Sequence, residues 1–90
     1  MTCIVSYDVS DDKRRDRLSH ILLDYGTRIQ ESVFWVDGED DTFERMRARV
    51  TAAADKEDSV WIVPICQACG KRIQTLGVAR VPKLAEYYVL

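Results

Sequence analysis

The sequence predicts an α+β sandwich in which two helices cover one side of a sheet. Two amphipathic segments, residues 11–25 and 41–55, repeat apolar side chains at the spacing of one helix face. Three segments rich in β-branched residues, 2–9, 27–36 and 58–66, predict strands. The chain has 90 residues, enough for one domain and not for two. We therefore expect a single layered domain.

The first strand and the first helix meet at an acidic junction. Alternation divides the side chains of strand 2–9 between two faces, with Ile4, Ser6 and Asp8 on one and Cys3, Val5, Tyr7 and Val9 on the other. Ser10 can cap the following helix, whose first turn contains Asp11 and Asp12. Gly26 is expected to end this helix. Its apolar face would consist of Leu18, Ile21, Leu22 and Tyr25.

The second strand, residues 27–36 (TRIQESVFWV), mixes polar and apolar residues. One face of a single strand here would present Arg28, Gln30, Ser32, Phe34 and Val36. Glu31 interrupts the apolar row on the opposite face, and the pattern offers no reason for it. Asp37-Gly38 predicts a turn. Asp41 precedes Glu44 by three residues, which is the spacing of a capping box at the start of a helix. The apolar face of helix 41–55 would be Phe43, Met46 and Val50 with Ala53 or Ala54.

The third strand, residues 58–66 (DSVWIVPIC), is apolar almost throughout. Such a run is typical of a central strand, although Pro64 argues against that position because proline cannot donate to a ladder. A turn at 67–70 and a short fourth strand at 72–76 follow, and the tail KLAEYYVL could form one more strand. The predicted order is strand, helix, strand, helix, strand, strand, with residues 35–40 available for an additional strand.

The sheet is expected to have one face that no helix covers. An uncovered sheet in so small a chain predicts dimerisation. The apolar end of the chain, Tyr87-Tyr88-Val89-Leu90, adds surface for a partner subunit.

Composition and charge exclude several classes of protein. The longest apolar run, residues 60–66, is far shorter than the roughly 20 residues that a membrane span needs. Three cysteines build no disulfide framework, which favours a reducing, cytoplasmic location. The net charge of −2 argues against a wholesale basic nucleic-acid binder. Basic residues do cluster at 13–17 and 45–49, interleaved with acids, which fits solvated helix faces or a local basic groove.

Two groups of residues could carry chemistry. Asp8 lies on the first strand and not at a helix cap, and its carboxylate is a hard oxygen ligand of the kind that Mg²⁺ uses. Cys66 and Cys69 have a C-x-x-C spacing, but only Cys3 and His20 remain to complete four zinc ligands. The chain also lacks the pattern around a thioredoxin-like redox motif. The spacing therefore favours two small residues at a tight turn.

Three blocks, YDVSDDKRRDRL, RIQESVF and DSVWIVPIC followed by QAC, occur in this order over most of residues 3–77. Together they resemble the small CRISPR-associated endoribonuclease family, the non-integrase subunit of the spacer-acquisition machinery. The resemblance implies a ferredoxin-like fold for residues 1–77, a symmetric homodimer and a divalent-metal site at the end of the first strand. Residues 78–90 would form a C-terminal extension with a strand that pairs with the partner subunit.

The resemblance also implies site residues. Asp8 matches the metal-binding aspartate of the family and Tyr7 the aromatic residue before it, while Arg15 and Arg17 match basic positions of the first helix. The second block adds Arg28, Gln30, Ser32 and Phe34. The implied cofactor is Mg²⁺, or Mn²⁺ in its place. If a two-fold axis ran near Asp8, the two carboxylates would need a cation or a proton between them.

Three functions follow as hypotheses. The first is a metal-dependent endoribonuclease or endonuclease that hydrolyses RNA or DNA during spacer acquisition for antiviral defence, with Asp8 as the ligand. The second is a non-catalytic dimeric scaffold that binds duplex DNA through its arginines and bridges dimers of the CRISPR-associated spacer integrase. The third is a toxin-type ribonuclease of the same fold. None of them involves a membrane partner.

Overall fold

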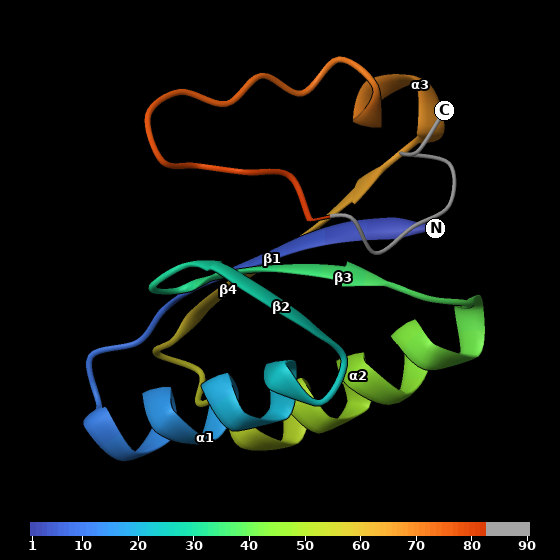
Figure 1. Ribbon diagram of the computed structural model, residues 1–90. Coiled ribbons are helices and arrows are strands. Elements are labelled where there is room, and N and C mark those ends of the chain that lie inside the picture. The colour runs from blue at the N-terminus through green and yellow to red at the C-terminus, as the bar shows by residue number, and fades with distance from the viewer. Residues whose placement is uncertain (83–90) are drawn as a thin grey trace.

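The computed structural model describes residues 1–82. Its elements in chain order are β1 (Thr2–Asp8), α1 (Asp12–Leu23), β2 (Gly26–Gln30), β3 (Val33–Asp37), α2 (Asp40–Ala53), β4 (Ser59–Ile65) and the single turn α3 (Gln67–Gly70). The strands form one antiparallel sheet in the order β2-β3-β1-β4, and α1 and α2 lie together on one side of it (Figure 1). The predicted α+β sandwich is confirmed, and the β-α-β-β-α-β order is that of a ferredoxin-like fold.

The single strand predicted for residues 27–36 is wrong. The chain reverses at Glu31 and Ser32, so that β2 and β3 form an antiparallel hairpin in which Arg28 lies opposite Phe34. The turn lacks the Asn-Gly or Asp-Gly pair that usually signals a two-residue hairpin, and the pattern therefore does not reveal the reversal. The turn also accounts for Glu31, which is exposed at the tip of the hairpin and belongs to no strand face.

The core lies between the sheet and the two long helices. Its fully buried apolar side chains are Val5, Leu18, Leu22, Phe34, Val36 and Met46. The alternation predicted for β1 is confirmed, because Cys3, Val5 and Tyr7 are buried while Asp8 is exposed. The predicted apolar faces of both helices are confirmed as well. No helix within residues 1–82 is long and apolar enough to cross a membrane.

β4 is an edge strand and not the predicted central strand. In the described sheet it pairs with β1 alone, and β1 is flanked by β3 and β4. An edge position tolerates Pro64, which has no N–H to donate. Trp61 and Val63 pair with Ser6 and Ile4 and remain 68% and 44% exposed. The apolar run of β4 therefore supplies an exposed surface and not a second buried face.

The sheet face opposite the long helices, which we call the open face, is only partly bare. α3 and residues 71–82 pass above it (Figure 1). Residues between 73 and 82 line a hollow of about 390 Å³ together with Trp35, which is 2% exposed. The expectation of a bare face is thus wrong at β3, while on β4 the side chains of Trp61 and Val63 are exposed.

The fourth strand predicted at residues 72–76 is also wrong. The N–H of Arg72 donates to the carbonyl of Cys69 and closes the α3 turn, after which the chain runs on outside the ladder. Residues 83–90, which contain the predicted tail strand and most of the predicted extension, lie outside the described residues.

The helix termini differ from the sequence prediction in three places. Asp11, and not Ser10, caps α1, because its carboxylate accepts the Arg14 N–H at 2.9 Å. Asp41 does not cap α2, because it lies within the first turn of the helix. Glu39 occupies the N-cap position. Gly26 does not end α1 but begins β2, where a Cβ would lie 2.2 Å from the Trp35 carbonyl oxygen. Close approach of two strands, and not a left-handed cap, accounts for this glycine.

Candidate metal and nucleic-acid site

A hollow of about 420 Å³ opens where the end of β1 meets α1 and the β2–β3 turn. The residues that line it are Tyr7, Asp8, Val9, Arg15, Asp16, Ser19, Arg28, Glu31 and Ser32. The fold brings Tyr7, Asp8, Arg15, Arg28 and Ser32 together here, and these are five of the eight residues singled out from the sequence. The hollow is therefore the candidate site.

Asp8 ends β1 at the edge of this hollow and is exposed. The ladder places it opposite Ser59, and the N–H of Tyr7 donates to the Ser32 carbonyl at 3.1 Å, which ties the strand end to the hairpin turn. Within residues 1–82 no three acidic, histidine or cysteine side chains gather as a metal cluster. Asp8 shares the lining of the hollow with Asp16 and Glu31, and Mg²⁺ binds through one or two carboxylates with phosphate oxygens and several waters.

Arg15 braces the connection between β1 and α1. Its Nη1 donates to the Val9 carbonyl at 3.0 Å and to the Ser10 carbonyl at 3.5 Å, and its Nη2 pairs with Asp12. A guanidinium carries five N–H groups, so these contacts fix the side chain and leave donors for an anion in the hollow.

Arg28 lines the hollow from the side of the β2–β3 hairpin. Its Nη1 donates to the Glu31 carbonyl at 3.0 Å, and its Nη2 donates to the Ser19 hydroxyl. The guanidinium lies 5.1 Å from the centre of the Phe34 ring, and that ring stacks on Tyr7 with centroids 6.1 Å apart. Both rings are buried, which leaves them the supporting role of fixing Arg28 and not the role of stacking on bases.

Two of the residues matched from the sequence lie elsewhere. Arg17 is exposed on α1 and does not line the hollow. Gln30 lies at the end of β2 and lines the separate hollow beneath residues 73–82. The shared strand face predicted for Arg28, Gln30 and Phe34 is wrong, because Arg28 and Phe34 meet across the hairpin and not along one strand.

Sequence reasoning missed several residues around the site. Ser19, which holds Arg28, follows Arg15 by four residues on the same helix face, a spacing that could have been noticed. The ion pair between Arg14 and Asp58 joins residues 44 apart and had no local signal. The Arg14 hydrogen bonds, and then the Asp55 N–H, hold the pKa of Asp58 below its usual range, and the same contact with Asp58 raises the pKa of Arg14.

Cys66 caps the α3 turn and Cys69 lies within it, away from the hollow, and both are exposed. The N–H of Cys69 donates to the Cys66 sulfur at 3.4 Å. This bond, followed by that of the Cys69 thiol, lowers the pKa of Cys66, while the bond to Cys66 raises the pKa of Cys69. The predicted tight turn is confirmed, and the absence of zinc stays a prediction.

The profile of the family described as CRISPR associated protein Cas2 matches residues 1–73. The chain belongs to the Cas2 family. A Thermus thermophilus relative named CRISPR-associated endonuclease Cas2 2 is 36% identical over 87 residues, which cover 96% of this chain and 92% of the relative. A Chloroflexus aurantiacus relative named CRISPR-associated endoribonuclease Cas2 1 is 31% identical over 88 residues, or 96% and 95% of the two chains.

Solved structures confirm the Cas2 fold. A hypothetical protein from Thermus thermophilus superposes with a TM-score of 0.80 at 34% identity, over 91% of this chain and 96% of that one. The structure of Streptococcus pyogenes Cas2 at pH 6.5 superposes with a TM-score of 0.75 at 30% identity. The match covers 86% of this chain and 100% of that one. The family resemblance seen in the three sequence blocks is therefore correct, and so is the ferredoxin-like fold that it implied.

Proposed function

We propose that this Cas2 chain is a metal-dependent nuclease that hydrolyses phosphodiester bonds of RNA or DNA in CRISPR spacer acquisition. The convergence of Asp8, Arg15 and Arg28 on one hollow is the observation that carries the proposal. A carboxylate for a metal beside two fixed guanidinium groups is a suitable set for a phosphodiester. The words endonuclease and endoribonuclease in the names of its relatives support the same reaction.

In this proposal Asp8 holds Mg²⁺, or Mn²⁺ in its place. The bound ion supplies Lewis-acid polarisation of a phosphate and lowers the pKa of a coordinated water. Arg15 and Arg28 donate N–H groups to the phosphate oxygens, and their contacts with the backbone and with Phe34 keep them oriented. Arg17, exposed on α1 outside the hollow, contacts the nucleic-acid backbone next to the site.

The working assembly in this proposal is a homodimer that joins the CRISPR-associated spacer integrase. A non-catalytic scaffold on duplex DNA is the second candidate, and it is supported by the finding that no three acidic, histidine or cysteine side chains gather as a metal cluster within residues 1–82. The CRISPR-associated names of the relatives support either candidate over a toxin-type ribonuclease.

Asp8→Asn separates the nuclease from the scaffold. The variant keeps the size of the side chain and removes its charge, so we expect Mg²⁺-dependent cleavage of RNA and DNA to disappear. Binding of nucleic acid should be kept or tightened, because a carboxylate no longer repels phosphate. Cleavage is measured on labelled strands with and without Mg²⁺, and binding by fluorescence anisotropy at several salt concentrations.

Arg17→Ala is the matched variant, because Arg17 lies outside the hollow. We expect it to weaken binding and to lower the salt slope by about one unit per phosphate contact, with cleavage at saturating substrate retained. If Asp8→Asn cleaves as well as the unaltered protein, Asp8 is not the metal ligand. If neither the unaltered protein nor Asp8→Asn cleaves and both bind duplex DNA, the scaffold is the correct function.

A further inference from the structure

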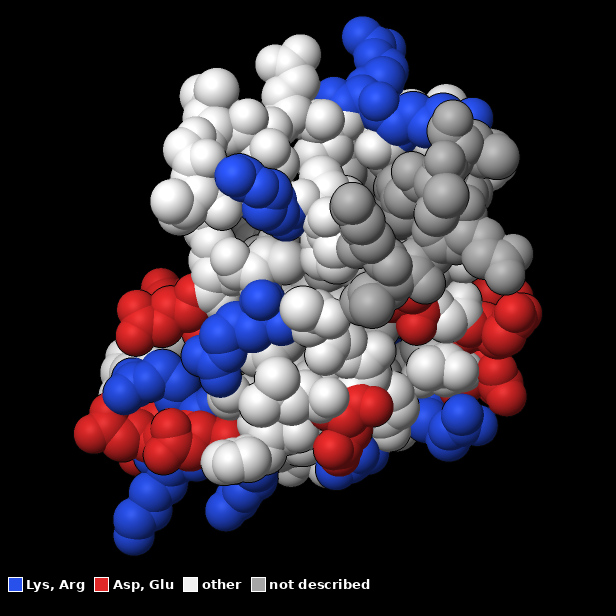
Figure 2. Space-filling view, viewed as in Figure 1, with Lys and Arg blue, Asp and Glu red and all other residues white. Residues whose placement is uncertain are grey.

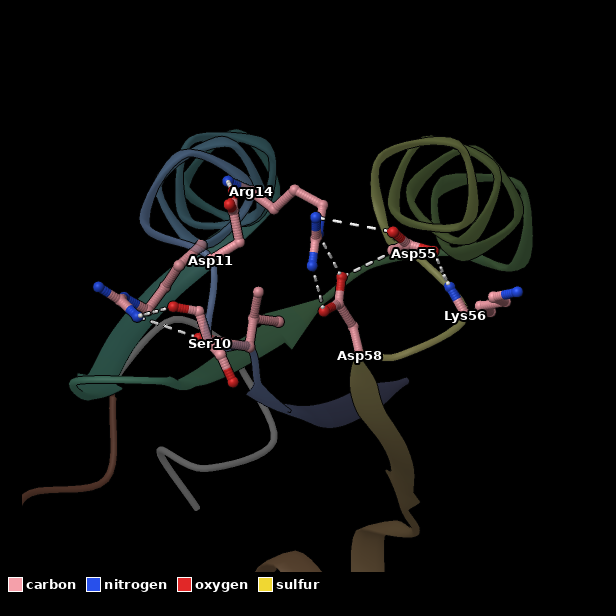
Figure 3. Close-up of polar contacts among 8 residues, drawn as sticks. Ser10, Asp11, Arg14, Asp55, Lys56 and Asp58 are labelled. Carbon is pink, nitrogen blue, oxygen red and sulfur yellow. Dashed lines mark hydrogen bonds and ion pairs between the residues drawn. The ribbon is translucent and has the colours of Figure 1, made fainter.

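We propose that Arg14 and Asp58 form a positioning pair that holds Asp8 in its place at the end of β1. The pair is made by two parallel bonds, from Arg14 Nε to Asp58 Oδ2 at 2.9 Å and from Arg14 Nη2 to Asp58 Oδ1 at 3.1 Å (Figure 3). A guanidinium fork on a carboxylate fixes direction as well as distance. The importance of this geometry for a metal rests on the proposed function of Asp8.

The pair differs from the other ion pairs of residues 1–82 in its burial. The Asp58 side chain is 3% exposed and that of Arg14 26%, whereas Arg49 and Asp24 are 47% and 60% exposed. Asp58 also accepts the N–H of Asp55 at 2.8 Å. With its oxygens engaged and little water around it, the carboxylate holds one orientation, which exposed ion pairs seldom do.

The pair connects the two points at which the Asp8 segment is anchored. On one side, Asp8 lies opposite Ser59 in the β1–β4 ladder, and Asp58 is the residue before Ser59. On the other side, the segment enters α1 at Asp11, whose carboxylate accepts the backbone N–H of Arg14. The Arg14–Asp58 ion pair therefore links the start of α1 to the start of β4, and β4 in turn pairs with the end of β1. These connections form a closed loop of contacts. Asp8 lies within that loop of contacts.

Arg14 and Arg15 are neighbours in the sequence with different partners. Arg15 braces the Val9 carbonyl from the side of the hollow, while Arg14 is held by Asp58 toward β4 and does not line the hollow. Arg14 thus belongs to the support of the site and not to its phosphate contacts. A metal held mainly by Asp8 depends on that support, because residues 1–82 gather no cluster of three ligands that would fix the ion.

Asp58→Asn tests this role, with Asp24→Asn as the matched control. Both variants replace the carboxylate of an arginine pair by an amide, and Asp24 lies in the exposed pair with Arg49. We expect Asp58→Asn to lower the NMR order parameters of the amides of residues 8–10 from about 0.85 toward about 0.6. Affinity for Mn²⁺, followed by paramagnetic broadening of the Asp8 resonances, should fall about tenfold, as for other residues that support a metal ligand. Asp24→Asn should change neither.

Unchanged order parameters in Asp58→Asn would overturn the proposal, and so would equal losses in Asp58→Asn and Asp24→Asn. If Asp58→Asn does not fold, Arg14→Lys gives the same two measurements with the charge kept and the fork removed. The proposed function fails separately: an unaltered protein that binds no Mn²⁺ has no metal at Asp8. In that case the order parameters alone decide whether the pair positions the strand end.

Discussion

Three arginines near the start of α1 have the same charge and three different environments. Arg14 pairs with the nearly buried Asp58, Arg15 braces the Val9 carbonyl, and Arg17 is exposed. The charge pattern of the segment is the same for all three, so only the partners brought in by the fold distinguish them. The side chain with the deepest partner is the one least able to meet a phosphate, since it would have to leave a buried carboxylate unpaired.

The depressed pKa of Asp58 gives the pair a pH dependence. The Arg14 hydrogen bonds, with the Asp55 N–H second, lower the pKa in the folded protein below the unfolded value of about 3.9. Ionised Asp58 therefore stabilises the fold above that value, and the contribution is lost as the pH falls through the folded pKa. We expect the thermal midpoints of the unaltered protein and Asp58→Asn to differ at pH 6 and to converge below about pH 4. Circular dichroism melts at pH 6 and at several pH values below 4 measure this, and a gap that stays constant down to the lowest pH would contradict it.

At the scale of elements, the sequence predicts helices better than strand partners. The apolar faces of α1 and α2 follow a 3.6-residue period that packing against the sheet requires, and both are buried as expected. Strand pairing lacks such a local signal: the β2–β3 turn has no Asn-Gly or Asp-Gly pair, and the apolar run of β4 is the same for an edge strand as for a central one. The residues of the hollow were found through the family blocks. The Arg14–Asp58 pair cannot be predicted from those blocks, because it forms only when β1 pairs with β4.

Gly26→Ala tests the close approach of β2 to β3. The added Cβ would lie 2.2 Å from the Trp35 carbonyl oxygen and 2.8 Å from Val36 Cγ2, so one strand must move. We expect a loss of about 1–3 kcal/mol in the free energy of unfolding, seen as a lower urea midpoint with an unchanged slope. Gly38→Ala is the comparison: its nearest neighbours are side-chain atoms of Thr42 at 3.0 Å and beyond, and its loss should be smaller. Equal stability of Gly26→Ala and the unaltered protein would refute the close-approach explanation.

At the scale of the whole molecule, acidic side chains are separated from apolar surface. Acidic and basic side chains interleave over the helical layer, while the part of the surface formed around residues 71–82 combines uncharged with basic side chains (Figure 2). The open face adds Trp61 and Val63 of β4 to this apolar area. Asp8 shares that face of β1 with Ile4 and Ser6 by alternation. A two-fold axis crossing the open face near β1 would cover the apolar side chains and bring two Asp8 carboxylates toward each other.

Trp61→Arg tests this arrangement. Trp61 is 68% exposed on the open face, and a specific dimer that buries about 1,200–2,000 Å² there would have to cover it. We expect the unaltered protein to sediment at twice its chain mass of 10.4 kDa at micromolar concentration and Trp61→Arg to sediment as a monomer. Leu23→Arg is the control, because Leu23 is 49% exposed on α1, in the helical layer away from that face, and should leave the dimer intact. A monomeric unaltered protein would refute the dimer. If Trp61→Arg is still a dimer, the interface does not include β4. The dimer would then give no reason for two Asp8 carboxylates to share one cation.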